Sequence, residues 1–83
     1  MSLLQYSRVQ AITGTTVRVN FPTGVWFVTE PAINVTIYGE ATNVDRTLVT
    51  GTVDGAQVYT GVDLVFPSTA VGKRAAILVT GDG

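Results

Sequence analysis

Oxygen-bearing side chains between residues 39 and 46 come closest to a chemical site in this sequence. Glu40, Asn43 and Asp45 offer the hard oxygen ligands that calcium prefers. Calcium takes about six to eight oxygens, however, and the spacing of these residues is not that of an EF-hand loop. Two carboxylates can also hydrolyse a glycoside, but that reaction needs a substrate cleft, which so short a chain can scarcely enclose. We therefore expect a solvated loop that binds no metal.

The side chains that most enzymes use are missing. The chain has no histidine and no cysteine, so a Ser-His-Asp or Cys-His arrangement cannot form, and none of its serines lies in a nucleophile-elbow sequence. Gly72 and Lys73 resemble the end of a phosphate-binding loop, but Pro67 replaces the first glycine of that loop and Arg74 replaces its Ser or Thr. We expect a protein that is not an enzyme and that has no cofactor.

Charged residues are scarce. Five basic and six acidic residues give a net charge of −1, and charged residues make up 13% of the chain, against about 25% in a typical soluble domain. Nucleic acid is not an expected partner, because neutralising phosphates takes a basic stripe and only Lys73 and Arg74 form a pair. No apolar stretch approaches the roughly 20 residues of a membrane span. A surface so poor in charge suggests that much of it is covered in the working state.

The length of 83 residues allows one domain, residues 1–83, in which residues 1–5 can serve as an N-terminal arm. A domain of this size buries only about 60% of the surface that its unfolded chain exposes, so its core alone stabilises it weakly. Disulfides are excluded, and a structural zinc site lacks its usual ligands. We therefore expect a homo-oligomer, a dimer or a trimer.

The pattern of apolar residues is that of a chain of short strands. Valine, isoleucine and phenylalanine alternate with polar residues in several segments, which is the period-two signature of a half-buried strand. No segment has a convincing 3.6-residue apolar period. Residues 25–28 and 75–79 are apolar runs typical of strands buried on both faces. The predicted strands lie at residues 5–12, 16–21, 25–28, 33–38, 47–53, 62–66 and 75–79.

The turn residues support the same fold class. Asp54 and Gly55 favour the positive φ angles of a two-residue type I′ hairpin. Thr13 and Gly14 are expected to turn a first hairpin, and residues 22–24 place Pro second and Gly fourth in a β-turn. Strands at such short intervals predict an all-β fold, a small antiparallel β-sandwich or barrel of about seven to eight short strands.

Aromatic and terminal apolar side chains are the candidate contacts with a partner. Trp26 and Phe27 are neighbours in a predicted strand, so one ring belongs to the core and the other is either covered or at an interface. Tyr38 is the better candidate for an exposed contact. Leu3 and Leu4 are expected to dock on the core or on a neighbouring subunit. The predicted contact residues are Leu3, Leu4, Trp26 and Tyr38 at the centre and Arg46, Lys73 and Arg74 at the rim.

The chain resembles the small all-β virion proteins of tailed bacteriophages, the capsid decoration or cement proteins and short head fibres. The resemblance rests on a short chain that starts at Met1 without a signal-peptide pattern, on scarce charge and absent cysteine, and on strands such as residues 15–21, Thr-Thr-Val-Arg-Val-Asn-Phe. It implies a structural protein that binds and braces an assembled shell. The implied partners are the major capsid protein or other virion subunits, and the implied location is the virion, after synthesis in the host cytoplasm.

An alternative is a small carbohydrate- or peptide-binding β module that uses Trp26 and the tyrosines. Aromatic rings supply large contact areas at a low entropy cost, which suits both sugar stacking and protein interfaces. The sequence leaves both functions open.

Overall fold

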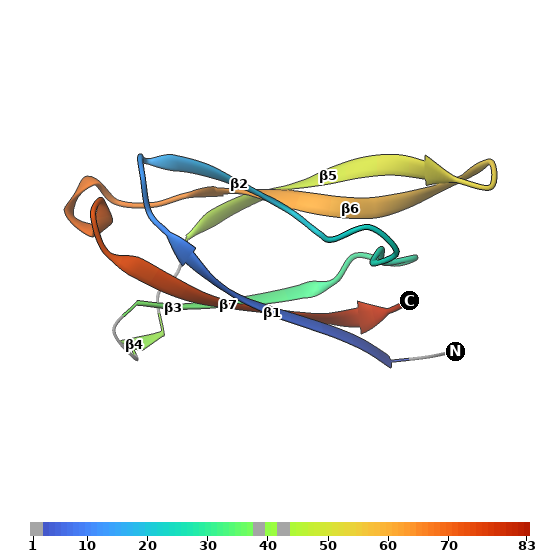
Figure 1. Ribbon diagram of the computed structural model, residues 1–83, viewed down its shortest axis with the longest axis horizontal. Coiled ribbons are helices and arrows are strands. Elements are labelled where there is room, and N and C mark those ends of the chain that lie inside the picture. Colours follow the sequence, from blue (N-terminus) through green and yellow to red (C-terminus); the bar gives the residue numbers. More distant parts are fainter. Residues whose placement is uncertain (1–2, 38–39, 42–43) are drawn as a thin grey trace.

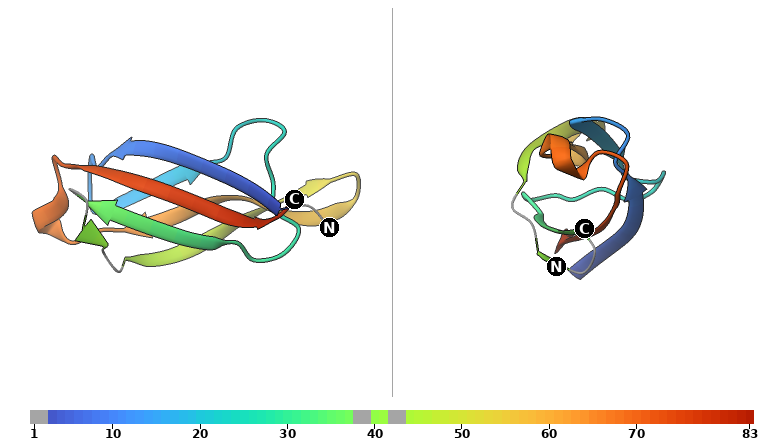
Figure 2. Two further views of the ribbon diagram at one scale, coloured as in Figure 1. Left: turned by 90° about the horizontal axis from the view of Figure 1, so that it is seen from below. Right: turned by 90° about the vertical axis from the view of Figure 1, so that its left-hand side faces the viewer.

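Two antiparallel sheets pack face to face in the computed structural model, which describes residues 3–37, 40–41 and 44–83 (Figure 1). Sheet A contains, in spatial order, β1 (Leu3–Ala11), β7 (Arg74–Asp82), β3 (Ala32–Ile37) and β4 (Glu40–Ala41). Sheet B contains β2 (Thr16–Asn20), β6 (Ala56–Val65) and β5 (Asp45–Val53). The expected all-β antiparallel sandwich is confirmed. Its extents are 40 × 20 × 19 Å, and β1 begins and β7 ends at the same end of the long axis (Figures 1 and 2).

The alternation of apolar residues decides which face of each strand is buried. In β2, Val17 and Val19 are buried while the residues beside them are exposed, and β7 buries Ala75, Ile77 and Val79 in the same way. Side chains alternate across a strand, so each sheet turns one apolar face toward the other sheet. The buried core of the described residues contains no polar or charged side chain.

Aromatic rings fill the sandwich near the end where β1 begins. Phe27 is fully buried and meets Phe21 edge to face, with ring centroids 5.3 Å apart. Phe21 also meets Tyr6, at 5.8 Å, so the three rings form one continuous cluster. Edge-to-face contact is a favoured geometry for aromatic pairs.

The strands of full length are slightly fewer than expected. Among the described residues, six strands have five or more residues, and β4 has two. The difference lies at residues 25–28, where the predicted strand is replaced by a single bridge between Phe27 and Tyr59. Phe27 exchanges backbone hydrogen bonds with Tyr59 of sheet B, whereas Val28 N–H donates to the Asp82 carbonyl of sheet A. Since adjacent residues bond to different sheets, this segment closes the sandwich instead of extending a ladder.

The predicted hairpin at Thr13 and Gly14 is wrong. The strands on either side of it, β1 and β2, belong to different sheets, so the segment is a crossing between the sheets. Its ends are fixed by hydrogen bonds from Ile12 N–H to the Lys73 carbonyl and from Phe66 N–H to the Thr15 carbonyl. The partner of β1 is the distant strand β7, and a local turn signal contains no information about that pairing.

The turn after β2 is shifted by one residue from the prediction. Val25 N–H donates to the Pro22 carbonyl, so the turn runs over residues 22–25, with Gly24 in its third position. Gly24 has a φ of 88°, the positive value that the third position of a type II turn requires.

The hairpin between β5 and β6 is confirmed. Val53 pairs with Ala56, and the two residues between them have positive φ, 50° for Asp54 and 81° for Gly55. Two positive angles define a type I′ turn, whose twist matches that of the strands it joins.

Replacing Gly55 by Val is predicted to destabilise the domain by about 1 kcal/mol or more, because a β-branched residue resists positive φ. The measurement is the urea midpoint of unfolding. Gly14→Val is the matched control, because Gly14 has no positive φ and a side chain there meets nothing within 4 Å. Equal midpoints for Gly55→Val and the unaltered protein would contradict the turn assignment.

Candidate functional site

The outer face of sheet A is a broad surface without charged side chains at its centre. Cross-strand pairing aligns β1 with β7 and β7 with β3, so that outward-facing residues form rows across the sheet. One row contains Ser7, Leu78 and Asn34, and the next contains Val9, Ala76 and Thr36. We call the surface formed by three residues from each strand the neutral face: Gln5, Ser7 and Val9 of β1, Ala76, Leu78 and Thr80 of β7, and Ala32, Asn34 and Thr36 of β3.

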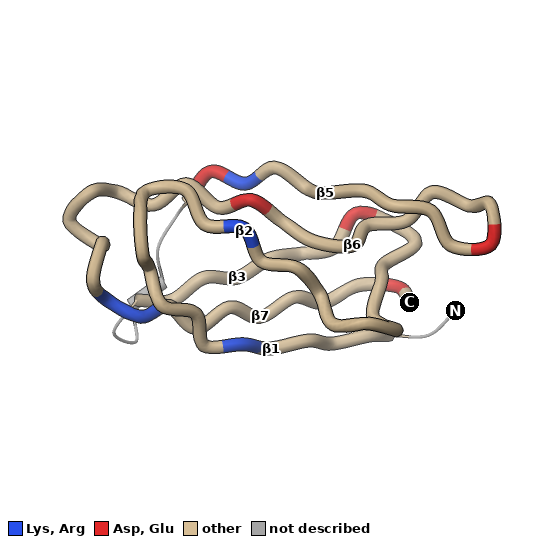
Figure 3. The backbone as a smooth tube through the Cα atoms, turned by 45° about the horizontal axis from the view of Figure 1, so that its top comes forward, with Lys and Arg blue, Asp and Glu red and all other residues tan. Residues whose placement is uncertain are grey.

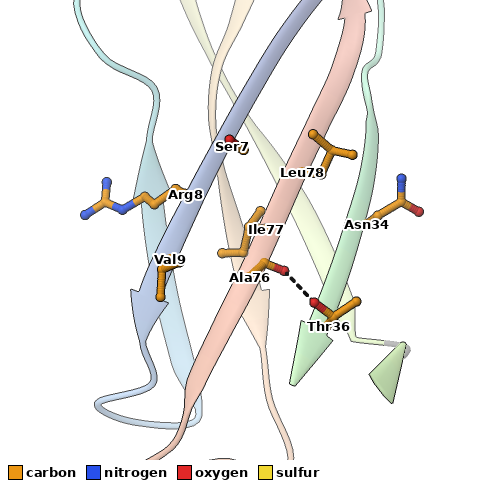
Figure 4. Close-up of a pocket in the computed structure, with 8 residues that line it drawn as sticks. All are labelled: Ser7, Arg8, Val9, Asn34, Thr36, Ala76, Ile77 and Leu78. Carbon is orange, nitrogen blue, oxygen red and sulfur yellow. Dashed lines mark hydrogen bonds between the residues drawn. The ribbon is translucent and has the colours of Figure 1, made fainter. Parts of the chain in front are cut away.

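A shallow groove runs across this face (Figure 4). Thr36 Oγ1 donates a hydrogen bond of 3.5 Å to the Ala76 carbonyl, which ties its hydroxyl to the sheet. Val9 is 64% exposed although it is apolar, so its burial against a partner would be favourable. Arg8, at the margin of the groove, extends past the edge of β1 and away from the other side chains drawn (Figure 4). The groove therefore offers small apolar groups, hydroxyls and one amide.

The outer face of sheet B has a different character. Arg18 of β2 and Asp63 of β6 are cross-strand neighbours and form a bidentate ion pair, with Nε–Oδ1 at 2.7 Å and Nη2–Oδ2 at 2.9 Å. Asp45, one row away at the start of β5, is also charged. Figure 3 shows charged residues on β2, β5 and β6. In sheet A it shows Arg8 on the edge strand β1 and charged residues at the two ends of β7. The nine positions of the neutral face thus carry no formal charge, although Arg8 lies at its β1 edge.

The ion pair changes the acid–base behaviour of both partners. The side-chain hydrogen bond to Asp63, aided by charge attraction, raises the pKa of Arg18. The same hydrogen bond is the main cause that lowers the pKa of Asp63 below its ordinary value of 3.8, although partial desolvation acts against it. Both groups remain accessible to water, with side-chain exposures of 58% and 26%. Such a pair links β2 and β6 across the outer face of sheet B.

The predicted apolar contact residues differ in exposure. Leu3 is 81% exposed at the start of β1, whereas Leu4 is half-buried and packs against the core. Both belong to β1, where Leu3 pairs with Asp82 and Leu4 with Gly81. The structure thus places residues 3–5 of the predicted arm in a strand of sheet A. Trp26 is half-buried in the segment between β2 and β3, and Tyr38 lies outside the described residues.

The predicted rim residues also have distinct surroundings. Arg46 is exposed on β5, and its Nη1 donates a hydrogen bond to the Ile33 carbonyl on β3, so it links the two sheets. Lys73 is half-buried, with its backbone N–H donating to the Ala70 carbonyl. Arg74 is exposed at the start of β7.

The predicted contact residues do not form one patch. Arg74 pairs with Ala11 at the end of β1, whereas Leu3 lies at the start of β1. Eight steps of about 3.4 Å separate these ends, or roughly 27 Å. Sequence reasoning missed the neutral face itself. Its signal is present as uncharged alternate residues in β1, β3 and β7, but it becomes visible only when the strand order is known.

The candidate metal loop is only partly described. Asp45 is exposed at the start of β5, Glu40 belongs to β4, and Asn43 lies outside the described residues. Within the part of the chain that the structure describes, no three His, Cys, Asp or Glu residues form a group that could hold a metal ion.

No family model, curated protein or solved structure matches this chain. Among residues 3–37, 40–41 and 44–83, no helix is long and apolar enough to cross a membrane.

The Arg18–Asp63 pair predicts a specific dependence of stability on pH. A carboxyl whose pKa is lower in the folded state stabilises that state above the unfolded pKa and loses this contribution as the pH falls through the folded value. Asp63→Asn should therefore lower the urea midpoint at neutral pH and have little effect well below pH 3.8. Midpoints measured across this range for both proteins test it. A difference that is independent of pH would show that the substitution acts through packing.

Proposed function

We propose that this protein is a non-enzymatic structural protein of a virus particle, a capsid decoration or cement protein that binds the assembled shell and stabilises it. The observation that supports this proposal is the neutral face, a three-stranded surface whose nine outward positions include no charged residue. The centre of a protein–protein interface is typically depleted of charged residues. A face of this composition suits contact with another protein better than permanent exposure to water.

The size of the face is compatible with a specific contact. Its strands lie along a molecule with extents of 40 × 20 × 19 Å, so one broad side covers at most 40 × 20 Å, or 800 Å² in projection. Stable interfaces commonly bury about 800 Å² on each partner. A contact of this size would therefore cover most of the neutral face, with the charged residues Arg8, Arg74 and Asp82 only at its edge and ends.

Stabilisation follows from mass action. A protein that binds assembled capsid subunits and not dissociated ones raises the free energy needed for disassembly. The major capsid protein or another virion subunit is the proposed partner, and the virion is the proposed location, reached after synthesis in the host cytoplasm.

A carbohydrate- or peptide-binding module is the alternative, and the placement of the aromatic rings favours it less. Tyr6 packs on Phe21, and Tyr59 is half-buried against the core. The groove on the neutral face is lined without an aromatic ring, so a sugar has no stacking platform there.

Thr36→Lys is predicted to weaken binding to the shell, because it places a cation in the neutral face that would have to be desolvated. Thr16→Lys, on the outer face of sheet B and in a row with Asp45, is the matched control and should bind normally. The measurement is the temperature at which particles carrying each variant rupture. If Thr36→Lys and Thr16→Lys protect particles equally, the neutral face is not the contact.

Binding should also resist salt, because the contact relies on apolar burial and neutral hydrogen bonds. At about 1 M salt the Debye length is only about 3 Å, so contacts between exposed charges are screened. Particles with and without the protein should then differ in rupture temperature at low and at high salt alike. Loss of the bound protein in high salt would assign the contact to the charged ends, and equal rupture temperatures in low salt would refute the bracing role.

A further inference from the structure

β1 is the longest edge strand of the described sheets that pairs without interruption, and its outer edge has no partner strand. Edges expose unpaired backbone groups, and proteins usually shield them with short strands, charges, prolines or bulges. Of the other edge strands, β2 has only five residues, β4 has two, and β5 contains a register shift at Val49 and Thr50. β1 pairs with β7 without interruption over nine residues, contains no Pro or Gly, and carries one charge, Arg8.

The hydrogen-bond pattern shows which groups of β1 are free. Ile12 N–H donates to the Lys73 carbonyl and continues the register in which Ala11 faces Arg74. In an antiparallel ladder the bonded residues alternate, so the even-numbered residues of β1 bond to β7 and the odd-numbered ones point to the open edge. Among the described residues, only one group of that outward set has a partner, the Ala11 carbonyl, which accepts from Gln10 Nε2. The outward set is Leu3, Gln5, Ser7, Val9 and Ala11.

We propose that two copies of this chain pair through the β1 edges around a two-fold axis at Ser7. In that arrangement Ser7 faces Ser7 of the partner subunit, Gln5 faces the partner's Val9, and Leu3 faces the partner's Ala11. Every outward residue then forms a hydrogen-bonded pair, and all nine residues of β1 are used. Addition of a strand to an open edge is an established way to form a specific protein contact.

The charge on β1 favours this register over its neighbours. With the axis at Ser7, Arg8 faces the partner's Tyr6, whose ring can attract a cation. With the axis at Arg8, the two guanidinium groups would face each other directly, which is destabilising. With the axis at Tyr6, the same residues of β1 would form the hydrogen bonds, with Leu3 opposite the partner's Val9 and Gln5 opposite the partner's Ser7. Ala11 would then have no partner within β1.

The pairing also covers apolar surface. Leu3 and Val9, which are 81% and 64% exposed, both lie in the outward set. In both views of Figure 2 the segment between β2 and β3 reaches past β1, so a partner strand would also meet the part of the chain that contains the half-buried Trp26. A two-fold axis perpendicular to the sheet places the two neutral faces side by side on one surface. Such a dimer could form whether or not the protein binds a capsid.

Ser7→Pro tests the edge directly. It removes one outward N–H at the axis but no bond to β7, so the domain should fold while the dimer dissociation constant rises at least about tenfold. Ser7→Ala, which keeps the N–H, should dimerise like the unaltered protein. Circular dichroism checks the fold, and light scattering from low micromolar to millimolar protein measures the dimer. A protein that stays monomeric throughout this range, or equal dimerisation of Ser7→Pro, would overturn the proposal.

Cysteine cross-linking tests the register without relying on Ser7→Pro, because the chain has no cysteine of its own. Hydrogen-bonded pairs have Cα atoms about 5.5 Å apart, within the range of a disulfide. Ser7→Cys should form a covalent dimer on mild oxidation. Gln5→Cys alone and Val9→Cys alone should not, since like positions are offset by four residues, or about 14 Å along the strand. An equal mixture of those two variants should cross-link.

Cross-linking of Ser7→Cys and of the mixture, but not of the single variants, supports the proposed axis. Equal cross-linking of all variants, or of Gln5→Cys alone, would show a different interface. These measurements use the free protein. A failure to protect particles would therefore not contradict the dimer, and a monomeric free protein would not contradict the contact with the capsid.

Discussion

Burial of one face of each sheet against the other is the constraint on which the rest of the structure depends. Ile77 and Val79 can lie in the core only if Ala76, Leu78 and Thr80 face outward, because side chains alternate strictly along a strand. A slip of one residue in the pairing of β7 would exchange the two sets. The neutral face is therefore the direct complement of the core, fixed by the same register that buries the apolar residues.

A core made of two thin sheets has to be closed at its open sides. Phe27 closes one end by bonding to β6 while the next residue bonds to β7. Arg46 closes part of a long side by donating to the Ile33 carbonyl, an edge group of β3 that points away from β7. The residue predicted as a rim contact thus already has a structural task. Among the described residues, the edge of β1 has no such link to the other sheet, whereas the other edge strands are short or contain a register shift.

Local patterns predicted the elements of this fold better than their arrangement. Alternation located β2 and β3 almost to the residue, and Asp54 with Gly55 identified the tight hairpin, because these signals act over two to six residues. The pairing of β1 with β7 joins the two ends of the chain, and no short pattern encodes it. The error at Thr13 and Gly14 has this origin.

The same limit applies to the candidate site. Exposed apolar residues such as Leu3 can be chosen from the sequence, but their distances from Arg74 depend on strand order. The neutral face draws three residues from each of three segments that are far apart in the sequence, and each segment alone looks like an ordinary half-exposed strand. What distinguishes the face is the absence of charge over the whole set, which is a property of the assembled sheet.

The distribution of charge limits how this protein can find a partner. The net charge is −1, and the Arg18–Asp63 pair neutralises itself on the opposite face, so little long-range attraction is available to speed an encounter. Specificity must then come from shape and from the register of neutral hydrogen bonds, which act only at contact. A two-fold dimer with two coplanar neutral faces would compensate, because the second face binds at a high effective concentration once the first is bound. On a shell of repeated subunits, pairing through the β1 edge would join two neutral faces. Several weak contacts without charge would then act together to hold the dimer on the shell.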